Sequence, residues 1–469
     1  MPLDFIKTKE QELVTESIRY VYSFYNRAKP FLVKGPDRVI RHPEWTRRLL
    51  DKLKAPDKKS FNIAVTGSKG KGSHAILLAG MLQKAGLRVG LFTSPHLVNF
   101  LERFRVDGQI IPNRSFIELT SQVREAALEF NVPEGQYIGP VGILAVIGAL
   151  WFELEGTDVN VFELGRGALH DDVNQIQHFG AVLTPVFLEH RDELGPLVED
   201  VYREKAGVIT EQTRYVVSHE QAKLMRHAMA DRKVMTQFFL GEDFNYQVLD
   251  SERSNQEFTK IQVSYGEFSS IICIQTGLSC YAENIAVAYT AFVQTMKSMN
   301  LSGNIPQNLD LTKLRLPGRM HVLSIHPLRL LDGSVHAVNA KLVAKWLDKM
   351  LAGGFNSRIG AVISIPATKD GQGLIDVLNR YFSWVYIVPA QNPHLVYTEA
   401  LLQYAKKIFS EVVSANSLDE AMQMIENAGR IDDGICFLGT QSFVGEVLTK
   451  FKHSAESIWE DTVYRGRGD

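Results

Sequence analysis

Residues 61–73 read FNIAVTGSKGKGS, and this stretch decides the fold. Its first five residues form a short apolar run of the length and composition of a buried β-strand. A turn with three glycines follows, and residues 75–85 are predicted to continue as a helix. A strand, a glycine-rich turn and a helix in this order are typical of a loop that holds phosphate at a helix N-terminus.

The loop itself, residues 67–73, is a shortened relative of the Walker A pattern. Its glycines allow backbone N–H groups to approach phosphate oxygens closely. Lys71 is expected to reach the β and γ phosphates, and Ser73 to bind Mg²⁺. A surface turn rich in glycine and lysine is the alternative, and the flanking strand and helix argue against it. The residues expected to contact nucleotide here are Gly67, Ser68, Lys69, Gly70, Lys71, Gly72 and Ser73.

Strands and helices alternate downstream of the loop. Strands are predicted at residues 88–92, 158–163 and 181–187, with a helix at residues 140–155. Glu163 and His190 then follow strands, at the edge of an open α/β sheet where ligands bind. Taken singly, Glu163 also suits a solvated strand end, His190 a structural histidine, and Lys205 an ordinary helix-surface lysine.

The rest of the chain predicts a second domain of the same class. Helical spacing covers residues 8–54, and short alternating strands are predicted at residues 244–250, 257–265 and 268–275, before a helix at residues 282–297. We predict an α/β protein: a P-loop ATPase domain with a mostly parallel sheet at residues 1–316, and a smaller Rossmann-like domain at residues 317–469. The second strand series is predicted at residues 328–332, 360–365, 384–388, 411–413 and 434–438.

Composition narrows the functional class. The 469 residues are 45% hydrophobic and 22% charged, with a formal net charge of -2, so no basic surface for nucleic acid or membrane is expected. No apolar run reaches the roughly 18 residues of a membrane helix, and the amino terminus is too charged for a signal peptide. The three cysteines indicate a reduced protein. We expect a cytoplasmic protein.

Several motifs together resemble one family. Residues 66–73 match a Thr-Gly-Thr-Asn-Gly-Lys-Gly-Ser loop except at Ser68 and Lys69, and residues 163–174, 188–195 and 203–209 match three further segments in order. Residues 92–97, 102–108, 317–319, 332–333 and 438–447 extend the match over nearly the whole chain. The chain resembles the folylpolyglutamate synthase branch of the Mur ligase superfamily.

The resemblance implies roles for residues along the chain. Lys71, Lys205, His190 and Arg319 would be catalytic, and Asn284, Arg319 and Asp332 would join the loop in binding ATP. Two Mg²⁺ ions are implied, and Lys205 would be carbamylated. The metal ligands would be Ser73, Ser94, Glu163, His190 and Lys205.

The implied activity is ATP-dependent amide-bond formation. A carboxylate of a small-molecule acceptor becomes an acyl phosphate, which the amine of an amino acid then attacks, most simply glutamate joining a folate. The implied protein is a monomer. One alternative is a Mur-type ligase for a non-folate acceptor in cell-wall, polymer or secondary metabolism. Another is a nucleotide-binding subunit with weak or no ligase turnover.

Three departures from the family pattern bear on these alternatives. Lys69 stands in place of the loop asparagine, and Ser334-Val335-His336 follows Asp332-Gly333 where the family has Ala-His-Asn-Pro. The Phe-Glu-x-x-Thr stretch that the family carries before its metal-binding glutamate is absent from residues 137–149. The first two departures concern how ATP is held, and the third concerns the acceptor.

Overall fold

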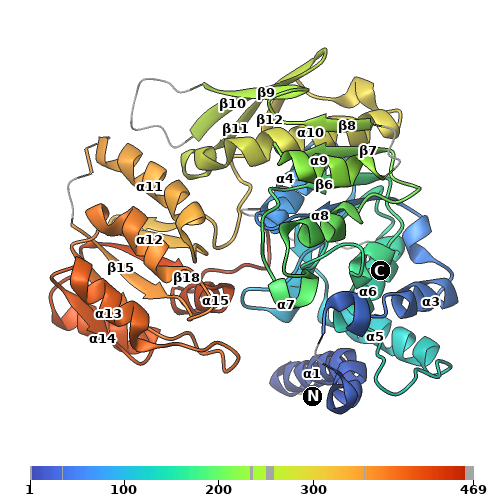
Figure 1. Ribbon diagram of the computed structural model, residues 1–469, viewed down its shortest axis with the longest axis horizontal. Helices are drawn as coiled ribbons and strands as arrows, with labels where there is room; N and C mark the ends of the chain where they lie inside the picture. The colour runs from blue at the N-terminus through green and yellow to red at the C-terminus, as the bar shows by residue number, and fades with distance from the viewer. Residues whose placement is uncertain are drawn as a thin grey trace.

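The computed structural model describes residues 3–33, 35–232, 236–249, 258–352, 354–355 and 358–459, which form two lobes (Figure 1). The larger lobe holds the N-terminal elements, and α11–α15 surround a separate sheet in the smaller lobe. The helices are α1 Leu3–Ala28, α2 Asp37–Ile40, α3 Glu44–Lys52, α4 Lys71–Lys84, α5 Asn113–Ala127, α6 Pro140–Glu155, α7 Arg191–Leu194, α8 Val198–Ala206, α9 Lys223–Ala230, α10 Ala282–Ser298, α11 Ala337–Ala352, α12 Gly371–Leu378, α13 Glu399–Ile408, α14 Leu418–Asn427 and α15 Gln441–Lys450.

An eight-stranded sheet of order β4-β3-β2-β5-β1-β6-β7-β8 forms the centre of the larger lobe. Strands from β2 to β8 in this order are parallel, and the two antiparallel pairings, β2 with β3 and β3 with β4, lie at one edge. The mostly parallel sheet is confirmed. Its strands are β1 Phe61–Thr66, β2 Val89–Phe92, β3 Phe104–Val106, β4 Gln109–Ile110, β5 Val159–Glu163, β6 Gly180–Leu183, β7 Tyr215–Ser218 and β8 Thr236–Phe239.

The strand order makes β1 a switch point. The chain leaves β1 through α4 toward β2 on one side, whereas β6 pairs with β1 on the other side. A crevice therefore opens at the carboxyl end of β1, where connections diverge. Helix α6 is apolar on nearly every face and is buried along most of its length, so it fills the layer against the sheet.

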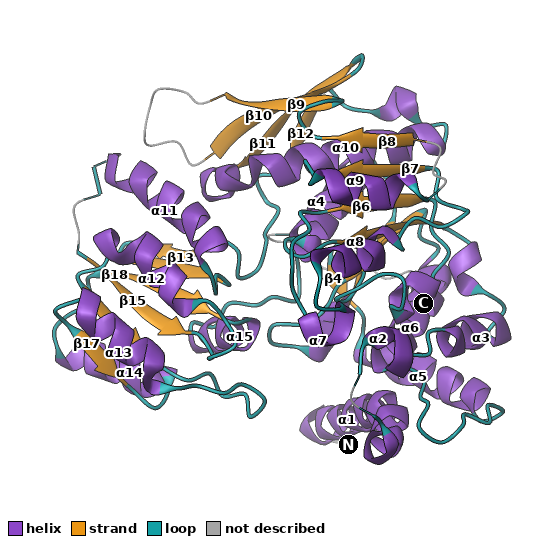
Figure 2. Cartoon of the chain, in the orientation of Figure 1, coloured by secondary structure: helices purple, strands orange, loops and turns teal. Residues whose placement is uncertain are grey.

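A four-stranded sheet covers α10 at the top of the larger lobe in Figure 2. Its strands are β9 Phe244–Leu249, β10 Phe258–Tyr265, β11 Phe268–Gln275 and β12 Asn308–Asp310. Ile261 and Ile274 from this sheet share one apolar core with Phe292 of α10 and Leu78 of α4. Helix α10 is thus fixed between the two sheets, which sets the position of its N-terminus beside the phosphate loop.

A six-stranded sheet of order β13-β14-β18-β15-β16-β17 forms the smaller lobe. All neighbours are parallel except β13 and β14, and helices lie on both faces as in a Rossmann-like domain. Its strands are β13 His321–Ile325, β14 Leu328–Asp332, β15 Ile359–Ser364, β16 Trp384–Ile387, β17 Val412–Ser414 and β18 Gly434–Gly439.

The segment after α15 returns to the larger lobe. Ile458 N donates to Gly108 O at 3.1 Å, and Arg315 N donates to Ile458 O at 2.8 Å. Trp459 is buried against the start of β4 and against Gly80 of α4. The predicted boundary at residue 317 falls between β12 and β13, but residues 455–459 return to contact the first domain, while the Ala455 side chain is still buried in the core of the second.

Several element predictions needed correction. Residues 8–54 are not one helical stretch, because Pro30, Pro36 and Pro43 separate α1, α2 and α3. Strand β6 ends at Leu183 rather than at residue 187, so His190 lies at the start of α7. Residues 250 and 257, at the ends of two predicted strands, lie outside the described residues.

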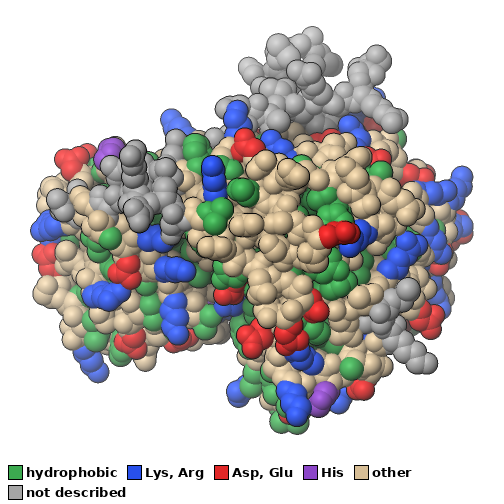
Figure 3. Space-filling view, turned by 90° about the horizontal axis from the view of Figure 1, so that it is seen from above, with side chains coloured by type: hydrophobic (Ala, Val, Ile, Leu, Met, Phe, Trp, Pro, Cys, Tyr) green, Lys and Arg blue, Asp and Glu red, His purple; other side chains and the backbone are tan. Residues whose placement is uncertain are grey.

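The surface and the cysteines agree with the composition. Acidic and basic side chains are interspersed over the face shown in Figure 3, where a notch separates the two lobes. Cys273, Cys280 and Cys436 are not joined in disulfide bonds in the part of the chain that the structure describes. Within the described ranges, no helix combines the length and apolar character needed to cross a bilayer.

Candidate active site

A cavity of about 710 Å³ lies between the lobes at the carboxyl end of β1. The first domain lines it with residues 68–73, 93–95, 163–166, 189–190 and 279–284. The second domain closes it with the linker residues 316–319, the end of β14 and the residues before α11. Most of the sequence-predicted site therefore meets in one place. The exceptions are Gly67 and Lys205, which do not line the cavity and are joined by a hydrogen bond from Lys205 Nζ to Gly67 O.

Two glycines shape the phosphate loop. Gly67 has a φ of +136°, and a Cβ there would lie 1.9 Å from Thr184 Oγ1 at the end of β6. Gly70 has a φ of +79° and ends the loop as the residue before α4. Both backbone conformations favour glycine. The loop can therefore lie close to β6 and turn sharply into the N-terminus of α4.

Two lysines share one backbone carbonyl beneath the loop. Lys71 Nζ donates to Gly67 O at 3.0 Å, and Lys205 Nζ donates to the same oxygen at 2.9 Å. Lys205 Nζ also donates to Arg166 O at 2.7 Å and pairs with Glu189 Oε1 at 2.9 Å. Lys205 is fully buried, and its three acceptors satisfy an ammonium group completely.

The buried position of Lys205 changes its acidity. Burial, and then the nearby positive charge of Lys71, lower the pKa of Lys205 from 10.5 to about 8. The Glu189 carboxylate opposes this by favouring the ammonium form. A fraction of the Lys205 side chain is thus a neutral amine at neutral pH.

Glu163 lies at the end of β5 and faces the loop. Its Oε2 accepts from Ser94 N at 2.9 Å and lies 3.3 Å from the position of a Cβ on Gly72. Burial raises the pKa of Glu163, while Lys71 and the Ser94 N–H lower it. A buried carboxylate that faces Ser73, Ser94 and a phosphate loop presents hard oxygen donors, the kind that Mg²⁺ prefers.

His190 stands at the mouth of the cavity, at the start of α7. Its backbone is left-handed, with a φ of +49°, and its side chain is about 40% exposed. Its Nε2 lies 3.8 Å from Glu189 Oε2, and burial lowers the pKa of His190. Glu189 thus stands between His190 and Lys205. The sequence interpretation did not assign Glu189, although its place directly before His190 was a usable signal.

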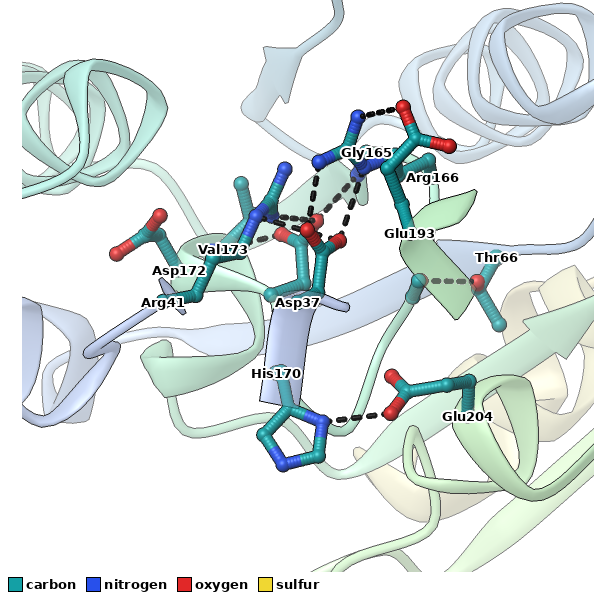
Figure 4. Close-up of polar contacts among 12 residues, drawn as sticks. Asp37, Arg41, Thr66, Gly165, Arg166, His170, Asp172, Val173, Glu193 and Glu204 are labelled. Carbon is teal, nitrogen blue, oxygen red and sulfur yellow. Dashed lines mark hydrogen bonds and ion pairs between the residues drawn. The ribbon is translucent and has the colours of Figure 1, made fainter. Parts of the chain in front are cut away.

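A charged network holds the loop after β5 (Figure 4). The Arg166 guanidinium donates to both Asp37 oxygens, at 2.6 and 2.9 Å, and to Glu193 Oε1 at 2.9 Å. Asp171 accepts from Gly165 N at 3.1 Å and pairs with Arg41 at 3.4 Å. This network connects α2 and α7 to Arg166, whose backbone carbonyl accepts a hydrogen bond from Lys205 Nζ.

The second domain supplies the opposite wall. Arg319 Nη1 lies 2.1 Å from the position of a Cβ on Gly333, so only glycine leaves room for the guanidinium there. Asp332 is buried and accepts from Met320 N at 2.8 Å and from the Ser334 hydroxyl. The Asp332 oxygens thus hold the linker to β14, and the role of Asp332 in binding ATP stays a prediction.

The altered segment after Asp332 places a histidine in the cavity. Val335 and His336 both line it. The His336 Nδ1 atom is buried and has no hydrogen-bond partner among the residues that the structure describes. Asn284 lies across from this segment, with its Nδ2 atom 3.6 Å from the Cβ position of Gly70. His336 thus lines the cavity one position later than the family pattern has its histidine.

Comparisons with known proteins agree on one family. The folylpolyglutamate synthase of Lacticaseibacillus casei is 30% identical over 417 residues, which cover 82% of this chain and 87% of that protein. The dihydrofolate synthase/folylpolyglutamate synthase of Escherichia coli is 27% identical over 393 residues, covering 83% and 86%. No family model matches the sequence.

Solved structures agree on the fold. A structure described as an FPGS–AMPPCP complex superposes with a TM-score of 0.74 at 24% identity, covering 94% of this chain and 99% of that one. A folylpolyglutamate synthase from Mycobacterium tuberculosis complexed with ADP and AMPPCP gives a TM-score of 0.72 at 20% identity, covering 88% and 96%. The P-loop domain followed by a Rossmann-like domain is therefore confirmed as the architecture.

Proposed function

The chain belongs to the folylpolyglutamate synthase family, and from this premise we propose that it joins glutamate to a folate carboxylate with hydrolysis of ATP to ADP. The reaction class is that of an ATP-dependent ligase that forms a C–N bond. The observation that carries the proposal is the meeting of Lys71, Glu163 and Arg319 in one cavity at the switch point of the first sheet.

The residues of the cavity divide the reaction between them. The loop amides and Lys71 would bind the ATP phosphates and offset the charge that develops during phosphoryl transfer to the acceptor carboxylate. The acyl phosphate that forms is attacked by the glutamate amine, and the phosphate leaves. Arg319 lies on the linker between the lobes, so closure of the lobes would bring its charge to the phosphates and exclude water.

Two Mg²⁺ ions fit part of this donor set. Ser73, Ser94 and Glu163 offer two hydroxyls and one carboxylate beside the phosphate loop, and Mg²⁺ would help to neutralise the phosphates there. His190 and Glu189 offer a second group of donors. These assignments are proposals from chemistry and position.

Carbamylation of Lys205 would require Glu189 to move. In its unmodified form Lys205 Nζ is surrounded by the Gly67 and Arg166 carbonyls and the Glu189 carboxylate, which suits an ammonium. A carbamate would bring two anionic oxygens against these three acceptors, so this arrangement does not fit it unless Glu189 moves away. The lowered pKa supplies the neutral amine that reacts with CO₂.

Cellular location and oligomeric state are the subject of two further proposals. We propose that it acts in the cytoplasm, where both substrates and reduced thiols are available, and that it works as a monomer. Support for the monomer is that both walls of the cavity come from the same chain. Size-exclusion chromatography with light scattering at the assay concentration tests the monomer directly.

A non-folate acceptor is the second candidate. The observation that favours it is the missing Phe-Glu-x-x-Thr stretch before Glu163, since residues 137–149 belong instead to a loop and to the buried face of α6. A ligase of this kind would have the same nucleotide cavity and a different acceptor pocket.

ADP release with a panel of acceptors tests the proposal. Turnover that requires tetrahydrofolate or dihydropteroate together with glutamate supports the folate reaction. Turnover with other carboxylates alone supports the second candidate. ATP binding without turnover on any acceptor overturns both and supports a nucleotide-binding subunit.

A further inference from the structure

Two buried histidines meet behind the phosphate loop. His74 follows Ser73 on α4, and His219 follows β7, 145 positions later. Their Nε2 atoms are 2.8 Å apart, and the rings meet edge to face with centroids 4.9 Å apart. His219 also lines the cavity, although only about 5% of its side chain is exposed. Neither histidine belongs to the segments that carry the family resemblance.

The partners of His74 decide which nitrogen carries the proton. His74 Nδ1 lies 2.7 Å from Gly70 O, and a carbonyl oxygen can only accept. His74 Nδ1 is therefore the donor, which leaves its Nε2 as an acceptor in the neutral ring. The His219 Nε2 must then donate across the 2.8 Å contact. His219 is the only described residue with a hydrogen bond to His74 Nε2.

The electrostatic surroundings favour this neutral arrangement. Burial lowers the pKa of His74 to about 4, and burial with the charges of His74 and Lys69 lowers the pKa of His219 well below its usual value. Glu283 Oε2 lies 3.9 Å from His219 Nδ1, beyond hydrogen-bond distance. The contact between the two Nε2 atoms requires one ring to be neutral, and the lowered pKa values leave both rings neutral at neutral pH.

The end of this chain of hydrogen bonds is a peptide group that faces the cavity. Gly70 O accepts from both the backbone N–H and the ring of His74, at 3.0 and 2.7 Å. The Gly70 carbonyl and the Lys71 N–H belong to the same planar peptide and point in opposite directions. Holding the carbonyl toward α4 therefore directs the Lys71 N–H outward, where a phosphate would lie. Gly70 has no side chain and a positive φ, so its own conformational preference does not fix this plane.

We propose that His219 is a positioning residue for nucleotide binding, which acts through His74 to fix the Gly70–Lys71 peptide with its N–H directed at the phosphates. This inference rests on the proposed ATP reaction. His219 touches neither nucleotide nor acceptor in this role. Its effect is to preform the loop, so it strengthens ground-state binding of ATP and ADP and leaves the chemical step nearly unchanged.

Three variants test the role of His219. His219→Leu leaves His74 Nε2 without a donor, and we expect the KM for ATP and the Kd for ADP to rise about tenfold with kcat changed by less than about twofold. In His219→Gln the side-chain amide can donate to the same atom, so both constants are expected to return to near wild-type values. His219→Leu is also expected to lower the melting temperature, because it leaves a buried acceptor without a donor. In the double variant His74→Val/His219→Leu both polar groups are gone, so the melting temperature is expected to return toward the wild-type value while ADP binding stays weak.

His178→Leu is the matched control. His178 is an equally buried histidine of the same domain whose ring atoms contact the Ile176 and Val208 carbonyls away from the cavity. It is expected to lower the melting temperature without changing ADP binding. Isothermal titration with ADP and Mg²⁺, together with the melting temperatures, measures all of these proteins.

The results distinguish failure of the proposed function from failure of the positioning role of His219. If wild-type protein fails to bind ADP, the proposed function fails. If wild-type protein binds ADP and His219→Leu or the double variant binds it equally well, the positioning role is wrong. The role is also wrong if His219→Gln binds as weakly as His219→Leu.

Discussion

The two walls of the cavity are built in different ways. On the first-domain wall, Lys71 and Glu163 have hydrogen-bond partners, and Lys205, which lies behind this wall, donates to the same Gly67 carbonyl as Lys71. On the second-domain wall, Asp332 secures its own linker, and His336 keeps an unpartnered buried nitrogen within the described part of the chain. On the proposed function, the first wall is thus preorganised for phosphate, whereas closure of the lobes would bring the second wall to the nucleotide.

The largest effect is expected on the preorganised wall. Lys71→Ala should lower the rate of ADP release by about 10³-fold or more, because the cation nearest the transferring phosphoryl group is lost. Circular dichroism should show an unchanged fold, and Lys59→Ala, at an exposed lysine before β1, serves as the control. Turnover at the wild-type rate in Lys71→Ala would refute the site assignment.

A smaller loss is expected on the second-domain wall. Arg319→Ala should lower kcat by about 10²-fold, since the site would close with one positioned charge missing. ADP binding should change much less, because the loop stays intact. Steady-state kinetics and ADP titration measure the two effects, with Arg114→Ala on exposed α5 as the control. Equal losses in ADP affinity and kcat would mean that the walls do not differ as described.

The C-terminal segment links the two walls and offers a stability test. Trp459 is buried against Gly80 and Gly108, and Lys84 lies 5.1 Å from its ring centroid. Trp459→Ala should cost about 3 kcal/mol of unfolding free energy, as for a large aromatic side chain lost from a core. Chemical denaturation measures this cost. Loss below about 1 kcal/mol would show that the returning segment contributes little to stability.

The smallest effect is a pH dependence from Lys205. Its pKa is about 8 in the folded protein against 10.5 for an unperturbed lysine, so the unfolded chain binds more protons here between these two values. Stability from this group therefore rises with pH across that window, and below pH 8 the cost of burying the charge is present in full. The unfolding free energy of wild type minus Lys205→Met should grow from pH 8 to pH 10. A constant difference would place the Lys205 pKa elsewhere.

Sequence patterns were sufficient for most strands and helices after residue 60 and for most of the cavity lining. The loop at residues 67–73, Ser94, Glu163 and Arg319 all lie in local motifs, because each follows a strand or a turn that its own sequence specifies. The positions of these residues in the site could therefore be predicted from the strands and turns that precede them in the sequence.

Contacts between distant segments were not predictable in this way. The Arg166–Asp37 pair joins residues 129 positions apart, and the His74–His219 contact spans 145 positions. Neither pair has a local spacing that marks it, since which side chains meet depends on how α2 and β7 pack on the first sheet. The return of residues 455–459 to the first domain was missed for the same reason.

The central claim is that ATP phosphorylates the acceptor carboxylate in this cavity. Its most direct test is turnover with a folate acceptor whose terminal carboxylate is labelled with ¹⁸O at both oxygens, followed by mass spectrometry of the phosphate released. An acyl phosphate intermediate predicts that each phosphate formed during glutamate addition carries one ¹⁸O atom from the carboxylate. Phosphate without label, released at the rate of amide formation, would contradict the account.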